Sequence, residues 1–190
     1  MTEEWDAKEL RGRLLVATPN LMDPHFFRTV VLVVEHTDEG SAGVVLNRPS
    51  ETGLSEGPLE EWETLAADPP LVFVGGPVAP GAAVCLAKSA PESRPPGWQP
   101  VVDGLGVLDL DHDLDQIKDG VDRIRMFAGY SGWGAGQLEG EIEEGSWYVL
   151  DADPEDALSS QPGGLWRFVL KRQGGKLAVV ANFPADPSYN

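Results

Sequence analysis

The sequence predicts an α+β fold in which a mixed, mainly antiparallel sheet, bent or closed into a partial barrel, is flanked by short helices. Short apolar, β-branched runs outnumber helical patterns along the chain. The helical patterns occur singly between strands, without the regular βαβ alternation of a parallel sheet. Because no repeat or linker divides the 190 residues, we expect one domain over residues 1–190, with 1–11 as a poorly ordered or helical N-terminal extension.

Strands dominate the expected first half of the chain. Apolar runs bounded by Gly, Pro and Asp residues indicate strands, and the short connection 38–41 between two of these runs predicts a hairpin. Apolar side chains recur three apart in 58–66, where Pro58 suits a first helical turn, so a short amphipathic helix is expected there. The strands are expected at 13–17, 29–35, 42–46, 71–74 and 82–87.

The second half mixes strands with short helices. Residues 89–100 carry four prolines and are expected to form an irregular, mobile loop. Asp113 and Gln116 resemble a capping box for a helix that ends at Gly120, and Gly145 is expected in a left-handed conformation after another helix. Strands are expected at 106–110, 123–128, 147–150 and 177–180, helices at 113–120, 137–144 and 165–172, and a tail at 184–190.

The charge of the chain makes nucleic acid an unlikely partner. The 31 Asp and Glu residues against 14 Lys and Arg residues give a formal net charge of -17, spread along the whole sequence. Such a surface repels phosphate backbones, so sequence-independent binding is not expected. The basic cluster of Arg167, Lys171, Arg172 and Lys176 is interpreted first as a solvated helix end whose cations oppose the negative pole of the helix dipole.

The same composition indicates a cytoplasmic protein without a membrane anchor. The longest purely apolar run, 30–34, is far too short to span a bilayer, and the first residues lack the basic start and apolar stretch of a signal peptide. A lone Cys85 cannot form an internal disulfide, which fits a reducing compartment. Oligomeric state cannot be inferred from these features.

No cofactor or metal is expected. The acidic segment 109–115 resembles a calcium loop, but Leu114 and Gly120 stand where an EF-hand needs Gly and Glu. Cys85 lies in an apolar strand pattern with no histidine placed beside it, so a structural role is favoured over a nucleophilic one. No glycine segment matches a phosphate loop or a dinucleotide fingerprint.

The segment 129–141 is the most informative of the chain because it combines glycines, two aromatic residues and two carboxylates. It predicts a strand that turns sharply into a short helix. Three turn-forming clusters, 47–49, 75–78 and 129–136, each follow a predicted strand. If the sheet brings the strand ends together, Arg48 would offer five donors for a carboxylate or phosphate. The candidate ligand-binding residues are Asn47, Arg48, Gly75, Gly76, Tyr130, Ser131, Trp133 and Glu139.

The alternative interpretation of these residues is structural. Arg48 would then pair with Glu139 or Glu141, the glycines would supply tight corners, and Trp133 would fill the core. Arginine and glutamate near chain junctions are more often internal ion pairs than ligand anchors. Whether Arg48 faces a concave site or an internal carboxylate therefore decides between the two interpretations.

Several separate segments in register resemble one family over most of the chain, from about Gly12 to Asn190. The resemblance is to the YqgE/AlgH family of uncharacterised bacterial proteins, and the chain departs from it mainly in the acidic loops 50–57 and 89–100. It implies an α+β domain with a bent, barrel-like sheet and a bacterial cytoplasmic protein; members are often labelled as candidate transcriptional regulators. The segments are 14–19, 23–26, 34–36, 43–49, 75–78 and 129–141.

Three functional hypotheses follow. The first is a non-enzymatic regulatory protein that recognises a small anionic ligand or a protein partner through the loops around Arg48, Gly75 and 130–133. The second is a hydrolase or transferase with Glu139 or Glu141 as a base near His36, and its motivation is carboxylates beside a glycine corner. The third is a DNA-binding regulator acting through the basic cluster, although the sequence has no helix-turn-helix pattern.

Overall fold

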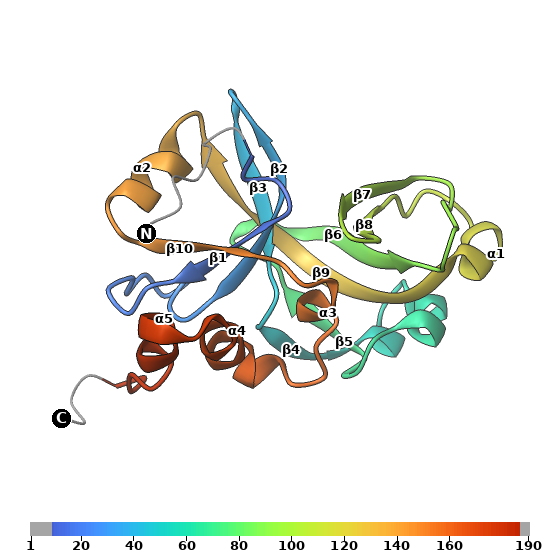
Figure 1. The fold of residues 1–190 in the computed structure, drawn as a ribbon. Coiled ribbons are helices and arrows are strands. Elements are labelled where there is room, and N and C mark those ends of the chain that lie inside the picture. Colours follow the sequence, from blue (N-terminus) through green and yellow to red (C-terminus); the bar gives the residue numbers. More distant parts are fainter. Residues whose placement is uncertain (1–8, 187–190) are drawn as a thin grey trace.

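A long central strand, β9 (Val121–Gly134), organises the structure, a computed structural model that describes residues 9–186. Figure 1 shows β9 passing through the middle of the molecule, with α2 beyond one end and α1 near the other. The expected α+β class with a mixed, mainly antiparallel sheet is confirmed. The other strands are β1 (Arg13–Ala17), β2 (Val30–Thr37), β3 (Gly40–Val45), β4 (Pro49–Gly53), β5 (Leu71–Val74), β6 (Val78–Ser89), β7 (Trp98–Val102), β8 (Leu105–Leu108) and β10 (Trp147–Asp151).

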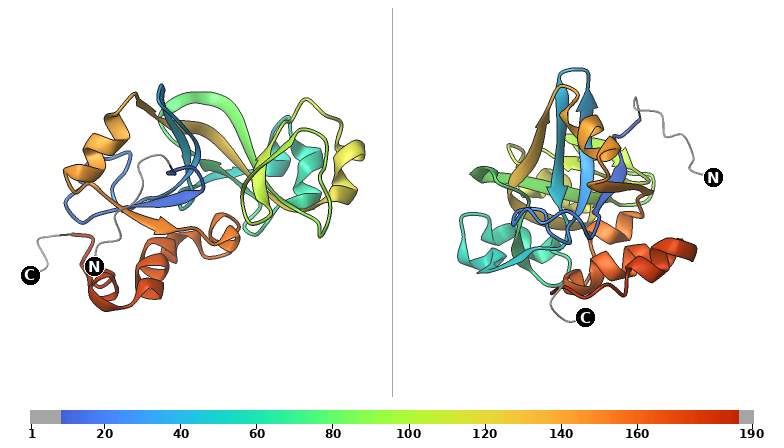
Figure 2. Two further views of the ribbon diagram at one scale, coloured as in Figure 1. Left: turned by 45° about the horizontal axis from the view of Figure 1, so that its top comes forward. Right: turned by 90° about the vertical axis from the view of Figure 1, so that its left-hand side faces the viewer.

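Short helices cover the outside of this sheet (Figure 2). The α-helices are α1 (Leu114–Ile117), α2 (Gln137–Glu143), α3 (Pro154–Ala157), α4 (Leu165–Gln173) and α5 (Gly175–Val180), and the 3-10 helices are η1 (Leu54–Glu56), η2 (Glu60–Leu65), η3 (Lys118–Gly120) and η4 (Pro162–Gly164). Among the described residues, no helix is long and apolar enough to cross a bilayer.

The sheet is continuous because β9 takes part in both of its halves. The strand order is β10-β1-β2-β3-β9-β6-β8-β7, and β5 adds a parallel pairing to β9. The first half of β9 pairs with β6, from Val121 opposite Ser89, and its last residues pair with β3, up to Gly134 opposite Gly40. The expected hairpin of β2 and β3 is present.

The sheet curls until its two ends in the strand order come close together. Arg11, just before β1, donates Nε to the carbonyl of Val34 in β2 at 2.9 Å and Nη2 to the carbonyl of Pro100 in β7 at 2.8 Å. A Cβ on Gly12 would lie 2.9 Å from the carbonyl oxygen of Val101, so the backbone of β7 passes directly against this glycine. These contacts hold the two ends of the bent, barrel-like sheet together.

β1 separates two apolar clusters, which explains why its sequence is a continuous apolar run and not an alternating one. Leu14 and Val16 face the cluster that α4 covers with Trp166, whereas Leu15 and Ala17 face the cluster that α2 covers with Leu138. A third cluster lies under η2 and α1, around Trp62 and the first half of β9.

Two backbone segments come very close together where the residues after β5 cross the second half of β9. The carbonyl oxygen of Gly75 accepts hydrogen bonds from the Val45 amide at 2.9 Å and from the Ser131 hydroxyl at 3.1 Å. A Cβ on Gly76 would overlap the carbonyl group of Tyr130 and the Ser131 hydroxyl. Only glycine fits at this crossing, because any side chain would overlap the neighbouring backbone.

Two local predictions are corrected by the structure. The expected strand 177–180 is helix α5, because the turn at Gly174 and Gly175 returns the chain onto α4, where Leu177, Val180 and Ala181 pack against the core with helical spacing. Asp113 does precede α1, but its side chain makes no capping hydrogen bond, so the capping box is absent.

Other boundaries differ by a few residues. The expected loop 89–100 ends earlier, because β7 begins at Trp98, whose indole N–H donates to the carbonyl of Ala87 at 2.9 Å. The expected strand-to-helix junction is confirmed, with β9 continuing to Gly134 and Gly136 in a left-handed conformation before α2. Gly145 has the expected positive φ after α2. Of the expected N-terminal extension 1–11, residues 1–8 lie outside the described residues.

Replacement of Gly76 by alanine is expected to destabilise the protein severely. The added methyl overlaps the backbone of Tyr130, and overpacking together with backbone strain costs about 2–6 kcal/mol. Chemical denaturation of Gly76→Ala against Gly57→Ala, where the structure has open space, measures the difference. Equal free energies of unfolding for the two variants would contradict the close crossing.

Candidate functional site

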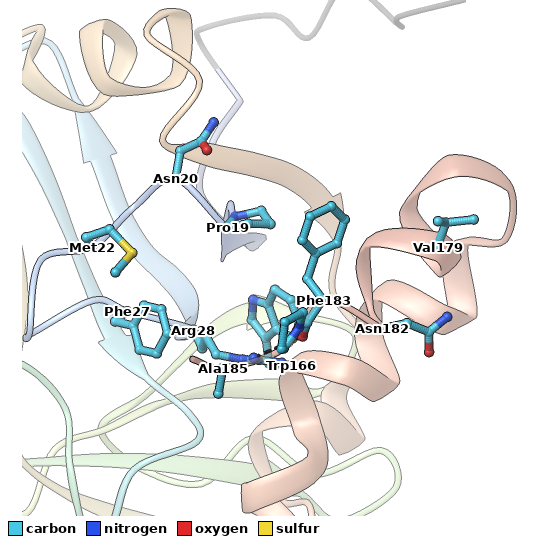
Figure 3. A pocket seen from close by; sticks show the side chains of 11 residues that line it. Pro19, Asn20, Met22, Phe27, Arg28, Trp166, Val179, Asn182, Phe183 and Ala185 are labelled. Atoms are coloured by element: carbon cyan, nitrogen blue, oxygen red, sulfur yellow. Dashed lines mark hydrogen bonds between the residues drawn. The ribbon is translucent and has the colours of Figure 1, made fainter. Parts of the chain in front are cut away.

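A recess lies between the loop 18–28, which connects β1 to β2, and the C-terminal segment formed by α4, α5 and the residues after them (Figure 3). Its volume is about 460 Å³, within the usual range of roughly 300–1,000 Å³ for small-molecule sites. We call it the Arg28 pocket. Its walls include Met22, Phe27, Arg28, Trp166, Val179 and Phe183.

The rim of the Arg28 pocket is unusually apolar for a surface. Met22, Val179 and Phe183 are 58%, 65% and 50% exposed, and among residues 9–186 they are three of five large apolar side chains left exposed. Exposed apolar side chains that gather around a concavity are typical of binding sites, whereas isolated ones are not. The sheet side of the pocket is rigid, because Trp166 is 3% exposed and its indole donates to the carbonyl of Ala17 at 2.9 Å.

Arg28 brings a positive charge to this apolar recess. Its guanidinium carbon lies 4.1 Å from the centroid of the Trp166 ring, and Nη1 donates to the carbonyl oxygen of Phe183 at 3.2 Å. No carboxylate among residues 9–186 forms an ion pair with it. Burial, and secondarily the nearby Arg167, lower the pKa of Arg28, but an arginine remains charged at neutral pH. The pocket therefore holds a cation with unused donors.

The predicted residues Asn47 and Arg48 lie behind the Arg28 pocket and fix the loop that forms its wall. Asn47 donates Nδ2 to the carbonyl of Arg28 at 2.9 Å and accepts from the amide of Val30 at 3.0 Å. Arg28 has a φ of 54, which is uncommon for a residue other than glycine, and the Asn47 bonds hold the backbone on both sides of Thr29 in place.

Arg48 matches neither alternative that its sequence context left open. Its guanidinium donates to the carbonyl oxygens of Pro24 at 2.9 Å and Phe27 at 3.1 Å, not to Glu139 or Glu141. Burial lowers the pKa of Arg48, and the charge of Asp23 partly opposes this effect. Arg48 is a half-buried brace of the loop 18–28, which places it one layer away from the recess.

The other predicted residues do converge, through their backbones. The amide of Val74 donates to the carbonyl of Arg48 at 2.8 Å, and Gly75 then contacts Ser131, which is fully buried. Gly76 lies against Tyr130 at the crossing of the chains. The three turn clusters therefore meet in the structure. Their junction is filled by backbone hydrogen bonds and closely packed backbone atoms.

Trp133 and Glu141 belong to the interior of the α2 side. Trp133 is 5% exposed, as the structural interpretation expected, and its indole N–H donates to Glu141 Oε2 at 2.9 Å. Trp147 donates to the same oxygen at 3.0 Å. With two indole donors on one oxygen, Glu141 attaches α2 to the sheet and is a poor candidate for a general base.

Glu139 and His36 do come together, as the enzymatic hypothesis required. His36 Nε2 lies 3.4 Å from Glu139 Oε1, and His36 Nδ1 lies 2.7 Å from the Ser41 hydroxyl. This order of atoms resembles a serine–histidine–acid series with the ring reversed, since the serine meets Nδ1. Ser41 is only 8% exposed, and His36 and Ser41 are paired neighbours on β2 and β3, so the arrangement also serves to join the hairpin.

The basic cluster is partly neutralised within the protein. Arg172 donates from both terminal nitrogens to Asp156, at 2.7 Å and 2.8 Å, and this carboxylate is 3% exposed. The Asp156 carboxylate raises the pKa of Arg172. Arg167 and Lys171 on α4 and Lys176 on α5 remain exposed, so three cations of the cluster are left at the surface.

The remaining candidates have no site geometry. Cys85 is 1% exposed in β6, and its burial raises the pKa of the thiol, which fits the expected structural role. Among the described residues, no group of three or more His, Cys, Asp or Glu side chains is arranged to hold a metal ion.

The Arg28 pocket was missed in the sequence because the loop 18–28 has no periodicity and lies far along the chain from Trp166 on α4 and Val179 on α5. The loop 18–28 carries Met22, Phe26 and Phe27, an unusual number of large apolar side chains for a connection between strands. Phe26 packs against Trp133 and Phe27 lines the recess. That apolar content was the one available signal, and Phe183 fell outside every predicted element.

Comparison with known proteins identifies relatives across nearly the whole chain. A family model described as AlgH-like (DUF179) matches residues 14–178. A UPF0301 protein of Thermobifida fusca is 47% identical, with 100% of both chains covered, and one of Streptomyces coelicolor is 49% identical, with 97% of each covered.

Two solved structures share the fold. A crystal structure of a protein from Corynebacterium diphtheriae matches with a TM-score of 0.86 and 30% identity, over 91% of this chain and 92% of that one. The solution structure of the AlgH protein from Pseudomonas aeruginosa matches with a TM-score of 0.70 and 27% identity, over 96% and 98% of the two chains.

Asn47→Ala is expected to loosen the wall of the Arg28 pocket. It leaves the buried Val30 amide without its acceptor, which costs about 1–3 kcal/mol, and it releases the Arg28 carbonyl. Faster amide hydrogen exchange at residues 26–30 and a lower free energy of unfolding are the expected results. Asn47→Asp keeps an acceptor for Val30 and serves as the control; unchanged exchange in Asn47→Ala would contradict the bracing role.

Proposed function

This chain belongs to the AlgH-like family of UPF0301 proteins, and from that premise we propose that it is a non-enzymatic, cytoplasmic regulatory protein that recognises a small anionic ligand in the Arg28 pocket. The names of its relatives specify no reaction. The anionic ligand inferred from the sequence is retained, and its anchor is reassigned from Arg48 to Arg28.

One observation carries this proposal: a guanidinium with unused donors, free of ion pairs with the described carboxylates, faces a recess with an exposed apolar rim. The chain has a net charge of -17, and five of its described Lys and Arg side chains form ion pairs with carboxylates. Arg123 and Arg172 both have carboxylate partners. An arginine left without one beside apolar walls is suited to an anion that arrives from solution.

The regulatory part of the proposal follows from how the pocket is built. Its two walls are the loop 18–28 and the C-terminal segment, which are joined directly by the bond from Arg28 to the Phe183 carbonyl and by the contact of Arg28 with Trp166. A ligand held by both walls would stabilise their closed arrangement, and any partner that reads this face would sense it.

The enzymatic alternative depends on the His36–Glu139 pair, and the DNA-binding alternative depends on the exposed members of the basic cluster. Arg172, which belongs to that cluster, forms an ion pair with Asp156. A protein partner at the rim of the Arg28 pocket is the alternative to a small ligand, and the ligand experiments below separate the two.

Binding of an apolar anion is expected to raise the melting temperature in an Arg28-dependent way. At a ligand concentration 100 times the dissociation constant the stabilisation is about 2.7 kcal/mol, which corresponds to roughly 5–10 °C for a chain of this size. The probes are octanoate, indole-3-acetate, phenyl phosphate and inorganic phosphate, and the measurement is a thermal shift.

The variants in this test are Arg28→Met, Arg28→Lys and the matched control Lys171→Met, which removes an exposed cation from the neighbouring helix face. We expect the shift in the native protein and in Lys171→Met, a smaller one in Arg28→Lys, and none in Arg28→Met. If no probe gives a shift that depends on Arg28, the proposed function is wrong.

The enzymatic alternative has its own test. A non-enzymatic protein should hydrolyse 4-nitrophenyl acetate at the same slow rate in the native form, in His36→Ala and in Glu139→Gln. Glu143→Gln, an exposed carboxylate on the same helix, is the control. A rate that falls in the His36 and Glu139 variants but not in the control would support catalysis and count against our proposal.

A further inference from the structure

Resting on the proposed function, we propose that the ligand of the Arg28 pocket is a monocarboxylic acid with an uncharged, apolar body. The number and placement of charges at the recess, the donors that line it and the shape of its walls favour this chemical class, which the proposed function leaves open.

The pocket offers one cation and few other donors for an anionic head. Arg28 is the one charged side chain among its lining residues, and Asn20 and Asn182 are the neutral polar ones. Pro19 and Pro184, which also line it, have no backbone N–H. Phosphate sites typically combine several cations or a nest of backbone amides, whereas this lining offers a single cation.

The orientation of Arg28 favours a planar head. The guanidinium carbon lies over the Trp166 ring, 4.1 Å from its centroid, and a single bond to the Phe183 carbonyl uses one of the five donors. The open donors lie in the plane of the group, where a carboxylate can accept two parallel hydrogen bonds. A tetrahedral phosphate can use the same edge but leaves its remaining oxygens facing apolar walls.

The net charge of the protein also favours a monoanionic carboxylate over a dianionic phosphate. A ligand that enters this site works against an overall charge of -17, with exposed Asp23 and Asp186 next in the chain to lining residues. The repulsive energy grows in proportion to the charge of the ligand, so a dianion is opposed about twice as strongly as a monoanion. The nearby Arg167 reduces this repulsion for both.

The body of the ligand is inferred from the walls on either side of the head site. Figure 3 shows Met22 and Phe27 on one side of Arg28, and Val179 on α5 on the other. Covering these exposed side chains contributes about 25 cal/mol per Å² of apolar surface removed from water. A carboxylate without an apolar body, such as acetate, would forgo this contribution.

The experiment compares four probes that differ in one property each: 4-phenylbutanoate, 4-phenylbutanamide, 4-phenylbutyl phosphate and acetate. Isothermal titration calorimetry on the native protein is expected to show binding of 4-phenylbutanoate, at least tenfold weaker binding of the amide and of the phosphate, and no detectable binding of acetate. The amide and acetate test the head and the body separately.

Three variants locate the binding. Arg28→Met should abolish binding of 4-phenylbutanoate, and Val179→Asp should weaken it at least tenfold by placing a carboxylate in the apolar wall. Val179 is 65% exposed, so this variant should keep the native melting temperature. Lys171→Met is the matched control and should bind as the native protein does.

The outcomes distinguish the two proposals. If 4-phenylbutyl phosphate binds as tightly as the carboxylate and is lost in Arg28→Met, the ligand class is overturned while anion recognition at Arg28 stands. If the amide binds as tightly as the carboxylate, or if Val179→Asp has no effect, the inferred class is also overturned. If no probe binds in an Arg28-dependent way, the proposed function fails together with it.

Discussion

The close crossing of Gly75 and Gly76 with the second half of β9 is the constraint on which the remaining structure depends. At this point one carbonyl oxygen, that of Gly75, accepts from Val45 in β3 and from Ser131 in β9. Three strands that are far apart in the sequence are thereby held at one place. Because β9 also continues into both halves of the sheet, this junction sets how sharply the sheet bends.

The candidate site depends on this junction indirectly. Strand β3 ends at Val45 beside the crossing, and Asn47 and Arg48, which follow after Leu46, turn their side chains onto the loop 18–28. That loop carries Arg28 in a conformation with positive φ, which persists when surrounding contacts enforce it. The wall of the pocket is therefore held by side chains whose own positions follow from the crossing.

Several arginines of this acidic protein are held by carbonyl oxygens and aromatic rings. Arg125 is 2% exposed, donates to the carbonyls of Asp68, Pro69 and Ser159, and lies over the ring of Phe73. Burial lowers its pKa to about 10, so it stays charged at neutral pH. Arg28 uses the same two types of contact at the surface, where it lines the recess.

Local patterns were sufficient to predict the fold class, most strands and the family. Apolar runs such as 13–17 predict strands because burial on both sides leaves no polar alternation, and glycines such as Gly145 predict where a helix ends because few other residues adopt positive φ. The candidate site inferred from the sequence required the segments around Arg48, Gly75 and Tyr130 to meet, and the structure brings them together.

The tertiary structure alone decided what those residues do. A guanidinium has five N–H donors and can bind a carboxylate, a ligand or several carbonyl oxygens. The position of the loop 18–28 decided that Arg48 donates to carbonyl oxygens. The same holds for 177–180, whose β-branched residues became a helix because α4 offered an apolar face. Arg28 and Phe183 are 155 residues apart in the sequence. A local sequence pattern cannot predict a contact between such distant residues, because only the folded chain brings the two walls of the pocket together.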